Sequence, residues 1–365
     1  MLLFTPGPTP VPENIRQAMA KETIHHRTPE FSKIFKEARE LLLELLKTDE
    51  VVMLSSSGTG AMEASVTNLC HKKALTINAG KFGERFGKIC QAHNIKHIEL
   101  KYDWDTPCDV DEVERVVKEN SDIDAIFLQI CESSGGLRHP VEEVAKRVKE
   151  IRDDIIVVAD GITAVGVEPI DTTNIDALIA GSQKALMLPP GLAMIGLSQR
   201  AIEKIGSGKG FYFNLANELK KQKDATTAFT PATTIIIGLR EILKEIKKYG
   251  FEYLYEETNK RALATREALK AIGLKIYPKK PANSMTAIFD EDAEEIRNIL
   301  KTRYGVNIAG GQEHLKGKLF RINHMGLIKP YEAAWVVNAI ERALDGIGRL
   351  KYSGIANKIF NELIK

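Results

Sequence analysis

Cysteine is scarce in this chain, and the four cysteines occur singly, at positions 70, 90, 108 and 131. Structural zinc sites need closely spaced cysteine pairs, and catalytic ones often use a His-Glu-x-x-His motif; neither pattern is present. Disulfide frameworks belong to small chains that are rich in cysteine, so none is predicted here. We therefore expect no metal site and a reducing compartment, the cytoplasm.

Long apolar runs and an excess of one charge are also missing. No stretch reaches the ~18 uninterrupted apolar residues that a membrane helix requires. The first ten residues, MLLFTPGPTP, lack the basic region and the apolar core of a signal peptide. The 51 Lys and Arg residues are balanced by 49 Asp and Glu, which excludes an overall basic surface for nucleic acid or acidic membranes. We expect a cytoplasmic protein with small-molecule partners, no nucleic acid and no membrane.

The distribution of apolar residues predicts an α/β fold. The composition, 44% hydrophobic and 27% charged, is that of an ordinary globular protein, and 365 residues suffice for two domains. Short apolar runs begin near positions 51, 74, 124, 154, 176 and 192, and they alternate with helical patterns such as 31–45 and 140–152. Such alternation is typical of a mainly parallel sheet with helices on both faces. The run at 192 closely follows the run at 176, which predicts one antiparallel strand.

After Thr234 the pattern changes to long Lys- and Glu-rich helical segments with brief strands. The predicted helices cover 234–249, 254–272, 291–303 and 330–347, and the strands lie near LKIYP, MTAIFD and LFRINH. We divide the chain into an N-terminal arm (1–20), a large domain (21–250) and a small C-terminal α+β domain (251–365).

The segment VVMLSSSGTGAMEASVTNL predicts a strand, a loop rich in Ser, Gly and Thr, and a helix. Glycine lets the backbone approach a ligand closely, and the free N–H groups of a helix N-terminus attract anions. Ser57, Gly58 and Thr59 could therefore hold a phosphate group. The motif lacks the Gly-Lys-Ser/Thr ending of a P-loop, and Glu63 replaces the third glycine of a dinucleotide fingerprint. A helix cap with a tight turn explains the same residues.

Two charged residues follow predicted strands of this sheet. Asp160 ends the strand before GITAVG, and Lys184 stands in GSQKALMLPP, 24 residues further on. Each alone has an ordinary explanation, since Asp160 could cap a helix and Lys184 could extend its amine to water. Taken with the phosphate loop, they supply what pyridoxal phosphate requires: an anion cradle, a carboxylate for its ring nitrogen and an amine for its aldehyde.

A series of ordered motifs spans most of the chain. They are TPGPTPVP (5–12), HHRTPEF (25–31), SSGTGAMEA (56–64), NAGKFGERFG (78–87), ESSGG (132–136), ADGITAVG (159–166), GSQKALMLPPGLA (181–193), IAGGQ (308–312) and FRINHMG (320–326). This series resembles the class V aminotransferases, which are fold-type I pyridoxal-phosphate enzymes, and especially the alanine–glyoxylate and serine–pyruvate group. The resemblance implies the fold-type I architecture, pyridoxal 5'-phosphate as cofactor and a homodimer.

The resemblance also implies roles for individual residues. Lys184 is expected to be the Schiff-base lysine and Asp160 the partner of the ring nitrogen, which makes these two the catalytic residues. The cofactor is expected to contact Ser57, Gly58, Thr59, Phe82, Ser133, Asp160, Ile162, Gln183, Lys184 and, across the dimer, Thr230. The substrate is expected to contact Gly7, His25 and Arg321, and the planar fork of Arg321 suits a carboxylate. Two positions depart from the family pattern: Thr227 stands where some relatives have Tyr, and Gly135 replaces the Thr of Glu-Ser-Ser-Thr-Gly.

The implied activity is a ping-pong transamination from a small amino acid, alanine or serine, to glyoxylate or pyruvate. Only Arg321 is matched to a carboxylate, which favours donors without a second acidic group. Aspartate or phosphonate-amine transamination, a lyase of the same fold and a non-catalytic protein that kept the fold are the alternatives. A desulfurase is disfavoured, because its nucleophilic cysteine generally lies late in the chain and no cysteine follows Cys131.

Overall fold

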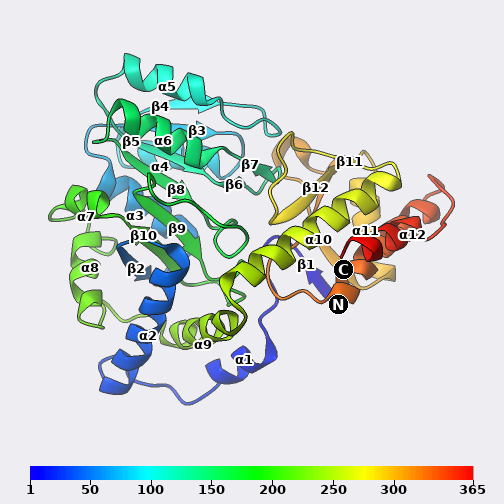
Figure 1. The fold of residues 1–365 in the computed structure, drawn as a ribbon, viewed down its shortest axis with the longest axis horizontal. Helices are drawn as coiled ribbons and strands as arrows, with labels where there is room; N and C mark the ends of the chain where they lie inside the picture. Colours follow the sequence, from blue (N-terminus) through cyan, green and yellow to red (C-terminus); the bar gives the residue numbers. More distant parts are fainter. Residues whose placement is uncertain (365) are drawn as a thin grey trace.

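A computed structural model describes residues 1–364 and contains two main β-sheets (Figure 1). The larger sheet has seven strands in the order β2 (Glu50–Leu54), β10 (Ala193–Leu197), β9 (Ala177–Gly181), β8 (Ile156–Asp160), β5 (Ile123–Gln129), β3 (Lys73–Asn78) and β4 (Lys96–Lys101). β10 runs antiparallel to both β2 and β9, and the other neighbours are parallel. The predicted α/β fold with a mainly parallel sheet and one antiparallel strand is confirmed.

Helices cover both faces of this sheet. One face packs against α2 (Pro29–Leu46), α5 (Val110–Glu119), α6 (Val141–Ile151) and α9 (Thr233–Tyr249), and the other against α3 (Gly58–Leu69), α4 (Gly83–Ala92), α7 (Gln199–Ile205) and α8 (Leu215–Lys223). Successive residues of a strand point to opposite faces, so Val157 packs with the first group and Val158 with the second. Burial on both faces explains why these strands are near-continuous apolar runs in the sequence.

The second sheet is formed largely by the C-terminal third of the chain. Its five strands are, in order, β1 (Leu2–Phe4), β13 (Val306–Gly310), β14 (Leu319–Asn323), β12 (Met285–Phe289) and β11 (Lys275–Ile276). An apolar core of its own joins it to α10 (Phe251–Ala271), α11 (Ala293–Arg303), α12 (Pro330–Gly346) and α13 (Ile355–Leu363). β1 pairs in parallel with β13, and Figure 1 shows both termini beside this sheet. The four helices predicted after Thr234 are all present.

The chain between β1 and α1 (Glu13–Met19) leads from the second sheet to the first, where α1 packs against α9. A short hairpin of β6 (Cys131–Glu132) and β7 (Leu137–Arg138) follows β5. The division into segments 1–20, 21–250 and 251–365 stays a prediction. Within residues 1–364, every helix is too short or too polar to span a bilayer.

Candidate active site

The carboxyl ends of the parallel strands form one edge of the seven-stranded sheet. β8 ends at Asp160, and β9 ends at Gly181, just before Lys184. Because β10 is antiparallel to both of its neighbours, β2 runs in the direction of β9, and the loop 55–57 leaves the sheet at the same edge. Ligands of α/β sheets bind at this edge. The topology therefore brings the predicted phosphate loop, Asp160 and Lys184 together.

Lys184 is half-buried, and its Nζ donates a hydrogen bond to the carbonyl oxygen of Pro6. The hydroxyl of Thr9 donates to the carbonyl oxygen of Lys184 over 2.6 Å, so the N-terminal segment also holds the lysine backbone. Gly7 has a φ of +117°, and a Cβ built there would lie 2.5 Å from Lys184 Nζ, so glycine leaves room for the amine. Burial lowers the pKa of Lys184 to about 8, which favours the neutral, nucleophilic form.

Asp160 is 5% exposed at the end of β8. Its Oδ1 accepts a hydrogen bond from Ile162 N over 2.9 Å, whereas Oδ2 accepts none from any residue in 1–364. Burial raises the pKa of Asp160 to about 6, and the charge of Lys184 acts in the opposite direction. A buried carboxylate that is ionised at neutral pH and keeps one oxygen unsatisfied fits the protonated ring nitrogen of pyridoxal phosphate.

The loop before α3 fits a phosphate group. Ser57 is the N-cap of α3, but its side chain makes no capping hydrogen bond, and the first N–H groups of a helix have no intrahelical acceptor. A Cβ at Gly58 would lie 2.3 Å from Ile162 Cδ1, so the helix packs directly on that side chain. Gln183 Oε1 is buried and has no hydrogen-bond partner in the described chain. The free backbone N–H donors of the loop are the groups that a phosphate would satisfy, whereas Gln183 Oε1 is itself an acceptor and needs a donor.

Phe82 is held in place by Glu132, a residue whose role the sequence does not indicate. The Oε2 of this buried carboxylate accepts hydrogen bonds from Phe82 N over 3.0 Å and Gly83 N over 2.8 Å. Its Oε1 accepts from the amide and the hydroxyl of Ser134 over 3.0 and 2.6 Å. Burial raises the pKa of Glu132, and the four hydrogen bonds act against that shift. Glu132 thereby ties the loop of Phe82 to the segment that carries Ser133.

Arg321 lies in β14 and is 8% exposed. Its Nη1 donates to Ser133 O over 2.6 Å, and its Nε and Nη2 donate to Gly310 O over 3.2 and 2.7 Å. Within residues 1–364 it forms no ion pair with a carboxylate. Burial lowers the pKa of Arg321 to about 10, so the group is still charged at neutral pH. A buried guanidinium without a carboxylate partner is a fitting place for an anionic substrate group.

Two predicted site residues make no hydrogen bond to the others in the single chain. His25 is exposed in the loop before α2, where its ring lies 4.7 Å from that of His26. Thr230 is exposed, and its hydroxyl has no partner among the residues described. The neighbouring Thr227 is buried and donates to Phe229 O over 2.6 Å. The roles of His25 and Thr230 stay predictions.

Arg85 was not singled out by the sequence, although it stands in the motif NAGKFGERFG. It lies in the first turn of α4, and its Nη1 donates to Thr59 Oγ1 over 3.0 Å. Its Cζ lies 4.7 Å from the centroid of the Phe82 ring. Sequence spacing alone cannot distinguish such an arginine from one that forms a surface ion pair with a neighbouring turn.

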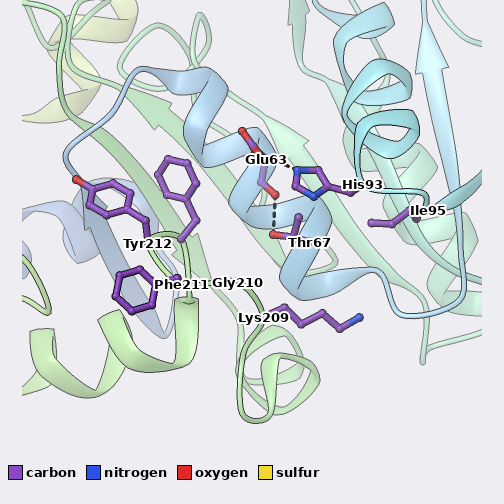
Figure 2. Close-up of a pocket in the computed structure, with 9 residues that line it drawn as sticks. Glu63, Thr67, His93, Ile95, Lys209, Gly210, Phe211 and Tyr212 are labelled. Carbon is purple, nitrogen blue, oxygen red and sulfur yellow. Dashed lines mark hydrogen bonds and ion pairs between the residues drawn. The ribbon is translucent and has the colours of Figure 1, made fainter.

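A separate cavity of about 370 Å³ lies between α3, the end of α4 and the segment 209–213 (Figure 2). Its carboxylate and imidazole are already paired, since Glu63 Oε1 lies 2.8 Å from His93 Nε2. Lys184, Asp160 and Arg321 do not line it. We therefore assign the candidate active site to the sheet edge and not to this cavity.

Comparisons with known proteins agree with this geometry. The family model described as aminotransferase class V matches residues 1–329. An uncharacterized aminotransferase of Helicobacter pylori is 53% identical over 362 residues, which are 99% of this chain and 98% of that protein. A serine–glyoxylate aminotransferase of Methylorubrum extorquens is 27% identical, with 97% of this chain and 94% of that protein covered. The crystal structure of a subgroup IV aspartate aminotransferase from Thermus thermophilus is 32% identical with a TM-score of 0.89, over 95% of this chain and 100% of that one.

Proposed function

The chain belongs to the class V aminotransferase family, and from this premise we propose that it transfers the amino group of alanine or serine to glyoxylate or pyruvate. Enzymes of this family use pyridoxal 5'-phosphate, and this chain is a pyridoxal-phosphate-dependent aminotransferase that acts on an amino acid and a 2-oxo acid. We propose that the two substrates react in ping-pong order, with Lys184 and Asp160 as the catalytic residues.

The observation that carries the proposal is the buried guanidinium of Arg321, which has no carboxylate partner among residues 1–364 and whose charge acts on Lys184. Burial is the main cause of the low pKa of Lys184, and the positive charge of Arg321 adds to it. A substrate carboxylate bound to Arg321 would neutralise that charge and direct the substrate toward the amine. Arginine suits this task because its planar fork binds a carboxylate through two parallel hydrogen bonds.

Each group has a defined part in the proposed reaction. When bound, pyridoxal phosphate supplies the electron sink for the pair that the substrate Cα–H bond releases. The amine of Lys184 would accept the Cα proton as general base and then, as general acid, donate it to the cofactor's aldehyde carbon. Asp160 would hold its negative charge against the ring nitrogen, and Arg321 would fix the substrate carboxylate so that the Cα–H bond faces Lys184.

The choice of small donors follows from the charges at the site. A donor with a side-chain acid would need a second cation. Lys81, near Phe82 in sequence, is already paired with Glu313, and Arg85 lies beside Thr59 of the predicted phosphate loop. The serine–glyoxylate aminotransferase relative supports serine and glyoxylate. Aspartate is the second candidate donor, because an aspartate aminotransferase is 32% identical to this chain.

We also propose that the active unit is a cytoplasmic homodimer in which the partner subunit's Thr230 completes the phosphate site. The support is the exposed, unbonded hydroxyl of Thr230 in the segment TAFTPATT. The segment divisions 1–20, 21–250 and 251–365 are part of this proposal, as arm, large domain and small domain.

The substrates are tested by half-reactions of the cofactor-loaded protein with one amino acid at a time. Alanine or serine should change the cofactor absorbance in a single turnover and release one equivalent of pyruvate or hydroxypyruvate, and glyoxylate should restore the spectrum. Aspartate and 2-aminoethylphosphonate should react at least about tenfold more slowly, because no second cation is assigned to their second acid. A faster reaction with aspartate would replace the proposed donor, and no spectral change with any amino acid would contradict a transaminase.

A further inference from the structure

Arg85 is a half-buried cation that no carboxylate of residues 1–364 neutralises. Other arginines of the large sheet's helices are paired, as Arg200 is with Asp176 at 2.6 Å and Arg115 with Glu119 at 3.0 Å. Arg85 makes one hydrogen bond instead, from Nη1 to Thr59 Oγ1. The remaining N–H groups of its guanidinium have no acceptor among the described residues. An unneutralised cation therefore lies directly beside the predicted phosphate loop.

The predicted cradle itself carries no formal charge. Its residues are Ser57, Gly58, Thr59, Gln183 and, across the dimer, Thr230, all of which are neutral. A phosphate monoester carries a charge of about −1.5 to −2 at pH 7, and the end of a helix offers about half a positive charge. The cradle therefore lacks the counter-charge that such a group needs when it leaves water.

We propose that Arg85 supplies this counter-charge by binding an oxygen of the cofactor's phosphate beside Thr59. The inference rests on the proposed cradle at residues 57–59. The fork of the guanidinium matches a phosphate through two parallel hydrogen bonds, and Arg85 keeps enough free N–H groups to form them.

Two further observations place the charge of Arg85 within the site. The guanidinium lies over the Phe82 ring, so a cation–π contact restricts its orientation before any ligand binds. Burial is the main cause of the shifted pKa values of Asp160 and Lys184, and the charge of Arg85 lowers both. The guanidinium is therefore near the two groups that would hold the other parts of the same cofactor.

Two titrations of the apoprotein test this inference. One uses pyridoxal phosphate, and the other uses pyridoxal, which lacks the phosphate. Arg85→Gln should weaken binding of pyridoxal phosphate by about 10- to 100-fold and change binding of pyridoxal by less than about threefold, because only the first ligand carries the anion. Arg85→Lys should recover part of the loss, since it keeps the charge without the fork. Lys88→Gln is the matched control, because it removes one charge from the same helix at an exposed residue paired with Glu84, and it should change neither affinity.

A second readout uses inorganic phosphate alone. Phosphate should raise the melting temperature of the wild-type and Lys88→Gln apoproteins and leave that of Arg85→Gln unchanged. If Arg85→Gln does not fold, the same comparison with Arg85→Lys decides, and wild-type affinity for pyridoxal phosphate in that variant would contradict the need for a fork at this position.

The other outcomes also decide the inference. An equal loss for pyridoxal and pyridoxal phosphate would mean that Arg85 acts through the Phe82 ring, and this result overturns the inference. Unchanged binding in Arg85→Gln overturns it as well and leaves the proposed function standing. Failure of the wild-type protein to bind pyridoxal phosphate would instead contradict the proposed function.

Discussion

Burial disfavours the charged form of both Lys184 and Asp160. The pKa of Lys184 falls to about 8, and that of Asp160 rises to about 6. Between these values Asp160 is mostly ionised, while the neutral fraction of Lys184 grows as the pH rises. An amine that removes a proton must be neutral, and a partner of a protonated ring nitrogen must be ionised. In the apoprotein at about pH 8, Asp160 is therefore ionised and about half of the Lys184 amines are neutral.

The protonation of Lys184 can be measured directly in the apoprotein. Trace acetylation across pH 6–11, followed by mass spectrometry of the peptide that contains Lys184, should give a midpoint near 8. The reactivity rises with pH because the neutral amine is the nucleophile. In the urea-unfolded chain the same peptide should have a midpoint near the ordinary lysine value of about 10.4. Identical midpoints in the two states would contradict the effect of burial.

Arg321 should contribute to binding of every carboxylate substrate. Arg321→Ala should weaken the donors' apparent affinity in single-turnover half-reactions by about 2–5 kcal/mol, because it removes one partner of a desolvated charge pair. The cofactor absorbance should remain, and Arg321→Lys should recover little. Arg303→Ala, at an exposed residue of α11, is the control. Unchanged affinities in Arg321→Ala would show that the arginine serves only its contacts with Ser133 O and Gly310 O.

The sequence predicts the site residues that follow strands, but it does not predict the residues that depend on contacts between distant segments. Asp160 and Lys184 follow apolar runs, so their place at a sheet edge follows from the sequence pattern. Glu132 binds amides 50 residues earlier in the chain, and Arg85 meets Thr59 on another helix. Local periodicity carries no signal for either pairing, because each depends on how two segments distant in sequence meet in the folded molecule.

The same limit applies to strands. The six predicted apolar runs correspond to β2, β3, β5, β8, β9 and β10, whose residues are almost all buried. β4, with the sequence KHIELK, was missed because it is an edge strand with charged and half-buried residues. β13 pairs with a strand from the opposite end of the chain, and its residues 307, 309 and 310 are only half-buried. Its sequence lacks the continuous apolar run that marks a central strand.

One buried carboxylate joins several elements of the large sheet. Asp176, just before β9, accepts hydrogen bonds from Val157 N over 2.8 Å and Ser198 Oγ over 3.0 Å. It also forms ion pairs of 2.6 Å with the buried Lys149 and with Arg200. β8, β9, α6 and the start of α7 therefore depend on this side chain for their mutual position.

Asp176→Ala should lower the free energy of unfolding of the apoprotein by about 3–5 kcal/mol, because it leaves the Lys149 amine with backbone carbonyl oxygens but no carboxylate. Urea unfolding followed by circular dichroism measures the change. Asp122→Ala, which removes an exposed partner of Lys73, should cost less than about 1 kcal/mol. Equal losses of unfolding free energy in the two variants would show that burial does not determine how much the Asp176 contacts stabilise the fold.

The candidate site lies between the two sheets, and segments that belong to each of them contribute residues to it. The segment after β1 passes Lys184 on its way to α1, and Arg321 reaches from β14 to Ser133. Lys81 pairs with Glu313, and the rings of Trp104 and His314 lie 4.7 Å apart, so loops of the large sheet contact the turn after β13. Movement of the second sheet relative to the first would therefore alter the substrate contacts.

At the scale of the whole molecule, the proposed dimer shares its phosphate site between two subunits. If the partner subunit's Thr230 completes the phosphate site, the cofactor should stabilise the dimer by mass action. Thr230→Val keeps the shape but removes the hydroxyl, so it should weaken cofactor retention and dimerisation together in analytical ultracentrifugation. Thr302→Val, at an exposed position of α11, should change neither. An active, cofactor-loaded monomer at assay concentration would refute the shared site.

The attachment of the cofactor to Lys184 is the most direct test of the proposed chemistry. The loaded protein is reduced with borohydride, digested and mapped by mass spectrometry, with Lys184→Ala as the parallel sample. One cofactor per chain should be found on the peptide that contains Lys184, and the folded Lys184→Ala variant should carry no adduct and lose turnover. An adduct on a different lysine, or full turnover in Lys184→Ala, would contradict the assignment.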